Sequence, residues 1–341
     1  MSGRRRGRID VARLEALLAR MAQQHVWVIG DVLLDAYLWG ASERISPEAP
    51  VPVVRVERES FALGGAGNVA RNVVALGAGC TLIGVVGDDG AGQRIAELAA
   101  AEGIASGLVI DPDRPTTLKS RVVARGQQML RIDRETESPI GTRARSEILA
   151  GLERGGSSKL RGAILADYGK GVLPRAFARA LIGRFAKSDV PVAVDPKHEL
   201  AGYRGAALVK PNRAEAARLV GAGDSGATDG LDLIDRLRAR LPGSDLAITE
   251  GARGMTIAEA GDPPIHVPTA RRDIFDVQGA GDTTMAAIWL ARLAGGSLLE
   301  SALIANAAAG VVVGKIGTAS AHRDEVGGRL AEVVDAFREN A

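Results

Sequence analysis

Short apolar runs, each typical of a buried strand, alternate along this chain with segments of helical periodicity. The runs span residues 26–29, 81–86, 162–166, 190–194, 207–209 and 246–248. A strand covered on both faces is apolar throughout, and parallel strands need a crossover between them, so the alternation predicts a mostly parallel sheet with helices on both faces. Apolar residues at helical spacing over residues 10–24 add a helix before the first strand. We therefore expect an α/β fold of three layers.

Two segments, residues 42–60 and 116–134, interrupt this alternation with extended, strand-like patterning. Arg125-Gly126 is a plausible hairpin turn within the second segment. We interpret both as a small β lid on one core of residues 26–341, preceded by a tail and helix over residues 1–25. Such a lid can exclude water from a reaction in the core.

The composition is that of an ordinary globular protein, with 46% hydrophobic and 25% charged residues among 341. The formal net charge is +2, and the N-terminal arginine run has no aromatic neighbours, which favours a solvated tail over nucleic-acid binding. Cys80 is the only cysteine, so disulfides within the chain are excluded and a reducing cytoplasm fits. No segment reaches about 18 uninterrupted apolar residues. We expect a cytoplasmic protein without a membrane partner.

The run of residues 276–283, Asp-Val-Gln-Gly-Ala-Gly-Asp-Thr, is the most informative stretch for function. Gly279 and Gly281 let backbone N–H groups approach an anion, and the uncharged stretch 283–291 predicts a helix beginning at that anion. Asp282 would repel a bound phosphate unless it had a task, such as accepting a proton from a substrate alcohol as a general base. The alternative makes Asp282 a helix N-cap and the glycines a turn.

Two further segments suit a sugar. Residues 64–72, Gly-Gly-Ala-Gly-Asn-Val-Ala-Arg-Asn, combine a glycine backbone with amide side chains that donate and accept hydrogen bonds, although they could simply form a turn capping a helix over residues 69–76. Asp31 and Asp35 follow the first strand and could accept hydrogen bonds from vicinal hydroxyls. Their alternative interpretation is a helix cap and a solvated charge.

Two more segments suit a nucleotide. Asn212 stands at a predicted strand-to-helix junction with Glu215 three residues later, a spacing that also suits a capping box. Residues 249–254, Thr-Glu-Gly-Ala-Arg-Gly, can form a hairpin turn or lay a hydroxyl and backbone amides along phosphates. The chain has neither a GxxxxGK[ST] P-loop nor a GxGxxG fingerprint after its first strand, so its phosphate site must be built differently.

Taken in order, these motifs resemble those of the ribokinase-like, or PfkB, family of carbohydrate kinases. The motifs are Gly64-Gly65 with Asn68, Asn212 with Glu215, Thr249 with Gly251 and Gly254, and Gly279-Ala280-Gly281-Asp282. Further runs at residues 44–53, 167–171, 195–197 and 313–318 are similar to the heptose 7-phosphate kinases of lipopolysaccharide precursor synthesis. The resemblance covers about residues 26–325.

The resemblance implies ATP-dependent phosphorylation of D-glycero-D-manno-heptose 7-phosphate at the anomeric O1, giving the 1,7-bisphosphate. It implies that Asp282 is the base and that the backbone of Gly279, Ala280 and Gly281 forms the anion hole. The implied ATP-binding residues are Asn212, Glu215, Thr249, Gly251, Gly254 and Lys197, with Glu215 orienting Mg²⁺ through water. The implied sugar-phosphate residues are Asp31, Asp35, Gly64, Gly65, Asn68, Arg71, Arg121, Arg125 and Lys170. The side chains that could bind the substrate's 7-phosphate are, without ranking, Arg71, Arg121, Arg125, Lys170 and Lys197.

Family members with an extended lid commonly pair through it, so we expect a homodimer through the exposed β edges of the lid. The family's common pattern at the anion loop begins Asp-Thr, whereas Val277 and Gln278 stand here between Asp276 and Gly279. The sequence therefore does not decide whether the chain has the family's monovalent-cation site. No histidine has a histidine neighbour of the kind found in the nucleotidyl-transferring domain of bifunctional relatives, so we expect a monofunctional kinase. The alternatives are a kinase for another sugar or sugar phosphate, and a non-catalytic sensor of sugars or nucleotides.

Overall fold

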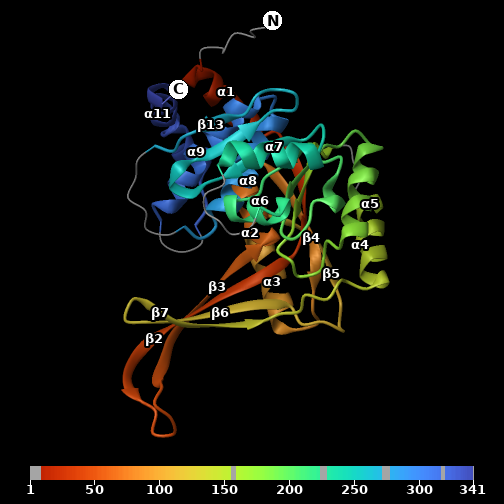
Figure 1. The fold of residues 1–341 in the computed structure, drawn as a ribbon. Helices are drawn as coiled ribbons and strands as arrows, with labels where there is room; N and C mark the ends of the chain where they lie inside the picture. The colour runs from red at the N-terminus through yellow and green to blue at the C-terminus, as the bar shows by residue number, and fades with distance from the viewer. Residues whose placement is uncertain (1–8, 155–158, 223–228, 271–276, 316–318, 341) are drawn as a thin grey trace, which may run out of the picture.

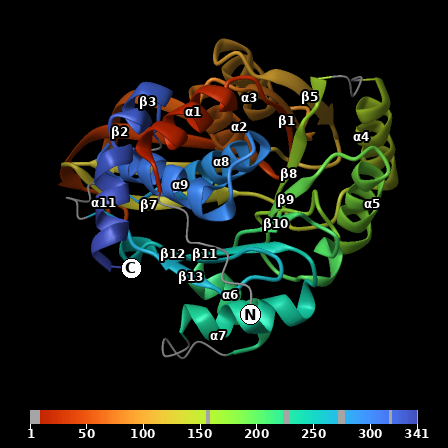
Figure 2. The ribbon, with the colours of Figure 1, turned by 90° about the horizontal axis from the view of Figure 1, so that it is seen from above.

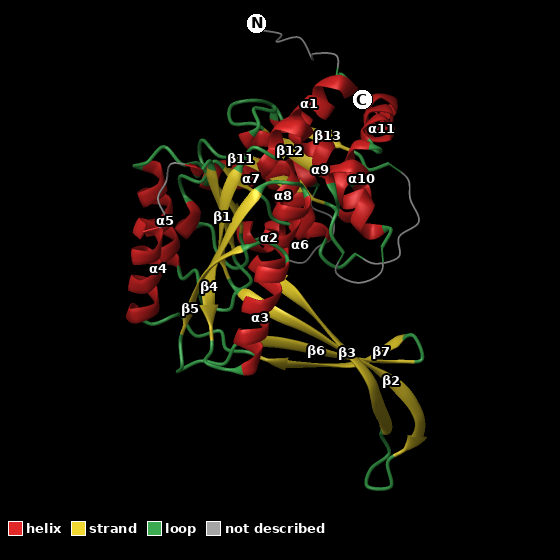
Figure 3. Cartoon of the chain, turned by 180° about the vertical axis from the view of Figure 1, so that it is seen from behind, coloured by secondary structure: helices red, strands yellow, loops and turns green. Residues whose placement is uncertain are grey.

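The computed structural model describes residues 9–154, 159–222, 229–270, 277–315 and 319–340 (Figure 1). The N-terminal arginine run, Asp276, residues 316–318 and part of the loop of residues 221–230 lie outside these ranges. Two sheets organise the described chain, a large one within the body and a small one that extends from it (Figures 1 and 3).

The large sheet contains all six predicted strands and three more. In spatial order its described strands are β13 (Ile265–Val267), β12 (Met255–Ala258), β11 (Asp245–Thr249), β10 (Leu208–Val209), β9 (Val192–Asp195), β8 (Gly162–Ala166), β1 (His25–Gly30), β4 (Gly79–Val86) and β5 (Ala105–Ile110). The strands from β11 to β5 run parallel, and β12 and β13 are antiparallel additions. β5 escaped prediction because it lies at an edge, where half-exposed residues replace a continuous apolar run.

Helices cover both faces of the large sheet, because successive side chains of a strand point to opposite faces. Val26 and Val28 of β1 join one hydrophobic core, and Trp27 and Ile29 join the other. The first core packs against α1 (Val11–Met21), α2 (Ala66–Ala75), α3 (Gly90–Ala101), α8 (Ala280–Leu293), α9 (Leu298–Val313), α10 (Arg323–Gly327) and α11 (Leu330–Asn340). The second packs against α4 (Thr142–Arg154), α5 (Arg175–Ala186), α6 (Arg213–Val220) and α7 (Gly230–Arg240). Figure 2 shows the two groups on either side of the sheet, so the predicted three-layer α/β fold is confirmed.

The N-terminal helix α1 belongs to the same core as the rest of the chain. Its apolar stripe includes Leu14, Leu17 and Met21, which are fully buried. Asp10 caps the helix by accepting a hydrogen bond from the N–H of Ala12 at 3.1 Å. Single turns of 3-10 helix are present at η2 (Ala201–Tyr203) and η3 (Gly251–Arg253). Within the described ranges, no helix combines the length and apolar character needed to span a bilayer.

The small sheet is the predicted lid, with strands in the order β3 (Pro52–Gly65), β2 (Val32–Ile45), β6 (Thr117–Ala124) and β7 (Gln127–Arg134). Arg125 and Gly126 form the turn between β6 and β7, at positive φ angles of 53° and 74°. The first lid segment extends beyond the expected residues 42–60, because β2 begins directly after β1. Its first five residues are all buried, so they lack the alternation that marks a lid strand in the sequence.

Candidate active site

Polar residues gather at the edge where the parallel strands of the large sheet end. Asp31 follows β1, Asp167 follows β8 and Asp195 ends β9. Backbone hydrogen bonds join these positions, from the N–H of Asp31 to the carbonyl of Ala166 and from the N–H of Asp167 to the carbonyl of Asp195, both at 3.1 Å. Ligands of open α/β sheets bind at such an edge.

The helix α8 begins at Ala280, earlier than the predicted stretch of residues 283–291. Its N-cap is Gly279, whose φ of 78° is costly for residues with a Cβ, and no side chain caps the helix. The N-cap alternative for Asp282 is therefore wrong, since Asp282 lies in the first helical turn. N–H groups of a first turn lack intrahelical partners, so this end of α8 offers donors to an anion.

Two side chains from other elements hold the Asp282 carboxylate. Tyr168, in the loop after β8, donates its hydroxyl to Oδ1 at 2.5 Å, and Asn68 of α2 donates Nδ2 to Oδ2 at 2.6 Å. Burial raises the pKa of Asp282, while these two hydrogen bonds and the charge of Lys210 lower it. A carboxylate has about four acceptor sites, so Asp282 can still accept a hydrogen bond from a substrate hydroxyl. These surroundings suit a general base.

Asn72 and Thr283 fix α2 against α8 and thereby set the position of Asn68. The hydroxyl of Thr283 donates to Oδ1 of Asn72 at 2.8 Å, and Nδ2 of Asn72 donates to the carbonyl of Asn68 at 2.9 Å. Asn72 was predicted only as one of the amides in the run of residues 64–72, and Tyr168 only as part of the run of residues 167–171; neither was assigned a role at Asp282. The available signals were the one-turn spacing of Asn72 from Asn68 and the presence of Tyr168 in the run of residues 167–171.

The carboxylate of Asp31 accepts hydrogen bonds from the backbone of the loop that carries Tyr168. Both of its carboxylate oxygens accept backbone N–H groups, from Tyr168 at 2.8 Å, Lys170 at 3.1 Å and Val172 at 2.9 Å. Burial raises the pKa of Asp31, and these bonds lower it. In this geometry the carboxylate of Asp31 holds the loop in place, rather than lying open to a sugar as expected.

Asp35 lies on β2 beside Gly64, where a Cβ would approach Oδ2 of Asp35 to 2.4 Å. Arg121 of β6 pairs with the other oxygen of Asp35 at 2.5 Å, and its guanidinium lies 5.4 Å from the ring centre of Tyr37. The Tyr37 hydroxyl donates to Oε1 of Gln278 at 3.1 Å. The lid therefore reaches both the expected sugar residues and the anion loop.

Gly65 is the N-cap of α2 and has a φ of 57°, so the turn alternative for the glycine run is present in the structure. The same turn places Asn68 in the first helical turn, where it meets Asp282. The local turn and the functional interpretation are compatible at this position.

Two other expected cations are engaged by acidic residues. Nζ of Lys170 lies 2.8 Å from carboxylate oxygens of both Glu135 and Glu137. Nε of Arg71 lies 3.9 Å from Glu102, the residue that follows α3. Arg71 is therefore oriented toward the end of α3.

Arg125 does not join the site of its own chain. It occupies the exposed turn at the outer end of β6, whereas Asp35 pairs in register with Lys119 near the start of that strand. Six residues of extended strand span about 20 Å. Arg125 was expected as one candidate cation for the substrate's 7-phosphate, and this separation from Asp35 corrects that expectation for a substrate bound in the same chain.

Asn212 and Glu215 form the capping box of α6 that their spacing predicts. Oδ1 of Asn212 accepts the N–H of Glu215 at 2.9 Å, and Oε2 of Glu215 accepts the N–H of Asn212 at 3.0 Å. Nζ of Lys197 lies 2.8 Å from Oε1 of Glu215. Because both oxygens of Glu215 are engaged by the chain, this side chain suits contact with a metal through water better than direct ligation.

Thr249 ends β11 next to Asn212, with which it forms a parallel bridge. Residues 249–254 connect β11 to β12 through η3, so the hairpin interpretation is confirmed. Gly251 and Gly254 have φ angles of 60° and 99°, and a Cβ on Gly254 would lie 2.1 Å from a backbone oxygen of Val267. The backbone here requires glycine at residue 254 whatever the loop binds.

A buried ion pair joins Lys210 to Asp195 at 3.0 Å. Burial raises the pKa of Asp195 to about 6; Lys210 opposes this rise, while the charges of Glu215 and Asp282 add to it. Neither Lys210 nor Asp195 had been predicted as a site residue. Among the described residues, no group of three or more His, Cys, Asp or Glu side chains could hold a metal ion.

A carboxylate held in the first turn of a glycine-capped helix is an arrangement that suits the general base of phosphoryl transfer from a nucleotide to an alcohol. Residues 23–325 match the family model described as pfkB family carbohydrate kinase. The chain belongs to this family and is a carbohydrate kinase.

Similar curated proteins carry the name Bifunctional protein HldE. The protein from Caulobacter vibrioides is 48% identical over 303 residues, which cover 87% of this chain and 61% of the relative. The protein from Geobacter metallireducens is 41% identical over 319 residues, which cover 93% of this chain and 65% of the relative. The chain thus spans less than two thirds of the length of these relatives.

Solved structures share the fold. Phosphofructokinase-2 from Escherichia coli, in complex with potassium, superposes with a TM-score of 0.73 at 21% identity and covers 91% of this chain and 98% of its own. Ribokinase from Arabidopsis thaliana, complexed with ribose and ATP, has a TM-score of 0.68 at 18% identity and covers 90% and 98%. These comparisons confirm the ribokinase-like fold.

Proposed function

We propose that this kinase transfers a phosphoryl group from ATP to the anomeric O1 of D-glycero-D-manno-heptose 7-phosphate, giving the 1,7-bisphosphate for lipopolysaccharide precursor synthesis. The observation that carries the proposal is the Asp282 carboxylate, half-buried in the first turn of α8 and held by Tyr168 and Asn68. Similarity to proteins named HldE supports a heptose phosphate over other sugars.

In the proposed step, Asp282 accepts the proton of the sugar hydroxyl as O1 forms a bond to the γ-phosphorus of ATP. The bond from that phosphorus to the bridging oxygen breaks, and ADP leaves with the bridging oxygen. Backbone N–H groups of Gly279, Ala280 and Gly281 would hold the oxygens of the transferring group. The protein's main contribution is then alignment and charge stabilisation, as phosphoryl transfer requires.

The ATP phosphates and ribose would lie along the edge formed by Asn212, Thr249, Gly251 and Gly254. Lys197 would face the phosphates if its ion pair with Glu215 opened. Mg²⁺ would neutralise phosphate charge and keep most of its water ligands, which suits a carboxylate that acts through water. We also propose that a monovalent cation binds near the anion loop.

Arg121 is the cation that the geometry favours for the substrate's 7-phosphate. It lies on the lid beside Asp35, and Asp35 with Gly64 and Asn68 would contact the sugar hydroxyls. A bidentate guanidinium suits a phosphate, and Arg121 could exchange one carboxylate partner for the substrate. Lys170 already forms ion pairs with Glu135 and Glu137, so it is a weaker candidate than Arg121 for binding the 7-phosphate.

We also propose a homodimer formed through the lid. Large apolar side chains are exposed on it: Ile45 at 63%, Val51 at 52%, Val56 at 44%, Leu130 at 49% and Ile132 at 55%. Apolar side chains gathered on an extended sheet are typical of an interface. Pairing through the lid would cover them.

The test of the reaction is ADP release by the purified chain with ATP and Mg²⁺. The acceptors are heptose 7-phosphate, sedoheptulose 7-phosphate, fructose 6-phosphate, ribose and adenosine. We expect selective turnover of heptose 7-phosphate and a loss of about 10²–10⁴-fold in kcat for Asp282→Asn, the range typical of a general base. Preference for another acceptor would refute the substrate, and full turnover by Asp282→Asn would refute the base. Sugar binding without any turnover would favour a sensor.

A further inference from the structure

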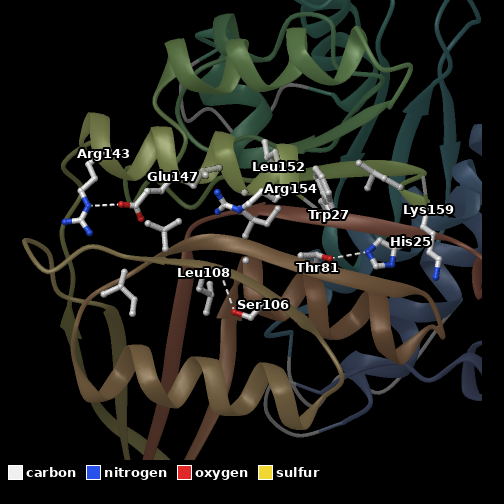
Figure 4. Close-up of a pocket in the computed structure, with 17 residues that line it drawn as sticks. His25, Trp27, Thr81, Ser106, Leu108, Arg143, Glu147, Leu152, Arg154 and Lys159 are labelled. Carbon is white, nitrogen blue, oxygen red and sulfur yellow. Dashed lines mark hydrogen bonds and ion pairs between the residues drawn. The ribbon is translucent and has the colours of Figure 1, made fainter. Parts of the chain in front are cut away.

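The charged side chains around the cavity between α4 and β5 do not converge on one point (Figure 4). Arg143 pairs with Glu147 at 2.7 Å, so their charges compensate. Arg154 and Lys159 lie apart, with Trp27 between them. This cavity therefore offers no single site for a charged group.

At the base of the lid, by contrast, one carboxylate joins two lysines. Glu135 directly follows β7, and its Oε2 lies 2.9 Å from Nζ of Lys119 on β6. Its Oε1 lies 2.8 Å from Nζ of Lys170, which belongs to the loop after β8. Glu135 therefore connects the lid to the loop that also carries Tyr168.

Lys170 is anchored in that loop through its backbone as well as its side chain. Its N–H donates to Oδ2 of Asp31 at 3.1 Å, and its carbonyl accepts Nη2 of Arg114 at 2.6 Å. The N–H of Tyr168 donates to the same oxygen of Asp31 at 2.8 Å. Because Tyr168 and Lys170 share this acceptor, a displacement of Lys170 also disturbs the bond that places Tyr168.

Burial distinguishes the two carboxylates that pair with Lys170. The side chains of Lys170 and Glu135 are 12% and 23% exposed, whereas that of Glu137 is 70% exposed. Charges interact more strongly away from water, so Glu135 is the stronger partner. Burial alone would raise the pKa of Glu135, but hydrogen bonds from Lys170 and Lys119 lower it below its ordinary value, so this carboxylate is ionised at neutral pH.

We propose that Glu135 is a positioning residue for the candidate base Asp282. Through Lys170 it holds the loop whose Tyr168 hydroxyl donates to the Asp282 carboxylate, and through Lys119 it ties that loop to the lid. Glu135 acts in this way without touching the reacting atoms. The proposal rests on the proposed role of Asp282 as general base, and it extends the support of that base to a residue of the lid.

The positioning role and a plain charge effect change the pKa of Asp282 in opposite directions. Glu135→Gln removes a negative charge, which by Coulomb's law alone would lower the pKa of Asp282. If the variant instead releases the loop of Tyr168, burial still raises the pKa of Asp282 while a hydrogen bond that lowers it is lost, so the pKa rises. Nearby charges that also act on Asp282 stay the same in the variant: those of Lys210, Asp35 and Asp195.

The test is a pH titration of the Asp282 carboxyl by NMR, in protein labelled with carbon-13 at its aspartate side chains and without any substrate. The Asp282 signal is identified by its loss in Asp282→Asn. In Glu135→Gln we expect the ratio of ionised to protonated Asp282 to fall at least about twofold at a given pH, the lower end of coupling within one hydrogen-bond network. A lowered or unchanged pKa of Asp282 would overturn the positioning role.

Two comparisons test the route from Glu135 to the base. Glu137→Gln is the matched control: Glu137 also lies 2.8 Å from Nζ of Lys170, but within the part of the chain that the structure describes it makes no ion pair with Lys119. We expect no rise in the pKa of Asp282 in this control, and an equal rise would contradict the special role of Glu135. In a Tyr168→Phe background, Glu135→Gln should raise the pKa no further. A full additional rise there would exclude Tyr168 as the intermediate.

Amide hydrogen exchange tests the connection to the lid. The loop N–H groups that donate to Asp31 should exchange at least about twofold faster in both Glu135→Gln and Lys119→Met, and at an unchanged rate in Glu137→Gln. Unchanged exchange in Lys119→Met would show that the lid takes no part. Because both measurements use neither sugar nor ATP, a different preferred acceptor would leave their result intact. Wild-type behaviour of Glu135→Gln would overturn this inference and leave the proposed reaction standing.

Discussion

Replacing Tyr168 by phenylalanine removes one hydroxyl from the candidate active site and keeps the ring. That hydroxyl donates to Oδ1 of Asp282 at 2.5 Å, and a hydrogen bond to a charged group contributes about 1.5–3 kcal/mol. The bond favours the ionised carboxylate, so its loss raises the pKa of Asp282 further, in the direction in which burial already displaces it. A general base works only when ionised, and therefore the acid limb of kcat/KM moves to higher pH.

The size of the expected activity loss follows from the free energy of this hydrogen bond. A loss of about 1.5–3 kcal/mol lowers the ionised fraction of Asp282 about tenfold to hundredfold at pH values on the acid limb. Activity falls by that factor there and recovers as the pH rises past the new limb, because the carboxylate itself is intact. A purely structural role for Tyr168 would instead lower kcat equally at every pH.

The assay is ADP release with the preferred sugar phosphate, followed from about pH 5 to 9 so that both limbs are covered. Tyr203→Phe is the matched control, since the Tyr203 hydroxyl donates to Oδ2 of Asp167 at 2.7 Å without contacting Asp282. An unmoved acid limb in Tyr168→Phe, or an equal movement in Tyr203→Phe, would refute the reasoning.

Arg121→Gln is expected to raise KM for the sugar phosphate at least about tenfold, because it removes one hydrogen bond between charged groups, while KM for ATP stays unchanged. An equal rise in Arg125→Gln at the lid turn would contradict the role of Arg121 in binding the 7-phosphate. Ile132→Asp should convert a dimer to a monomer in light scattering, whereas Leu231→Asp, equally large and 43% exposed on α7, should not; a dimer retained in Ile132→Asp would exclude this part of the lid from the interface. Lys210→Met leaves the carboxylate of Asp195 without its ion-pair partner and should lower the free energy of unfolding by about 3–5 kcal/mol at pH 8. With Lys210 present the pKa of Asp195 is already raised to about 6, and the loss of Lys210 raises it further, so Asp195 is protonated at pH 5 and urea titrations should show a smaller loss of unfolding free energy there.

Local patterns were sufficient for most of the scaffold. The apolar runs predicted six parallel strands, the Asn212–Glu215 spacing predicted a capping box and Arg125-Gly126 predicted a turn; all are present. Each depends on residues close in sequence, whose periodicity or turn chemistry decides the local conformation. The beginning of β2 was not predicted, because strand residues buried on both faces lose the alternation that identifies a lid strand.

The fold class, the place of the candidate base Asp282 in a glycine-rich helix start and the presence of a lid could all be predicted from residues near one another in the chain. The groups that surround Asp282 could not be predicted in this way, because they come from distant segments. Tyr168 and Asn68 meet Asp282 across 114 and 214 residues, and Arg121 meets Asp35 across 86. Contacts over such separations leave no periodicity in the chain, because they form only when β8, α2 and β6 pack beside α8 and β2.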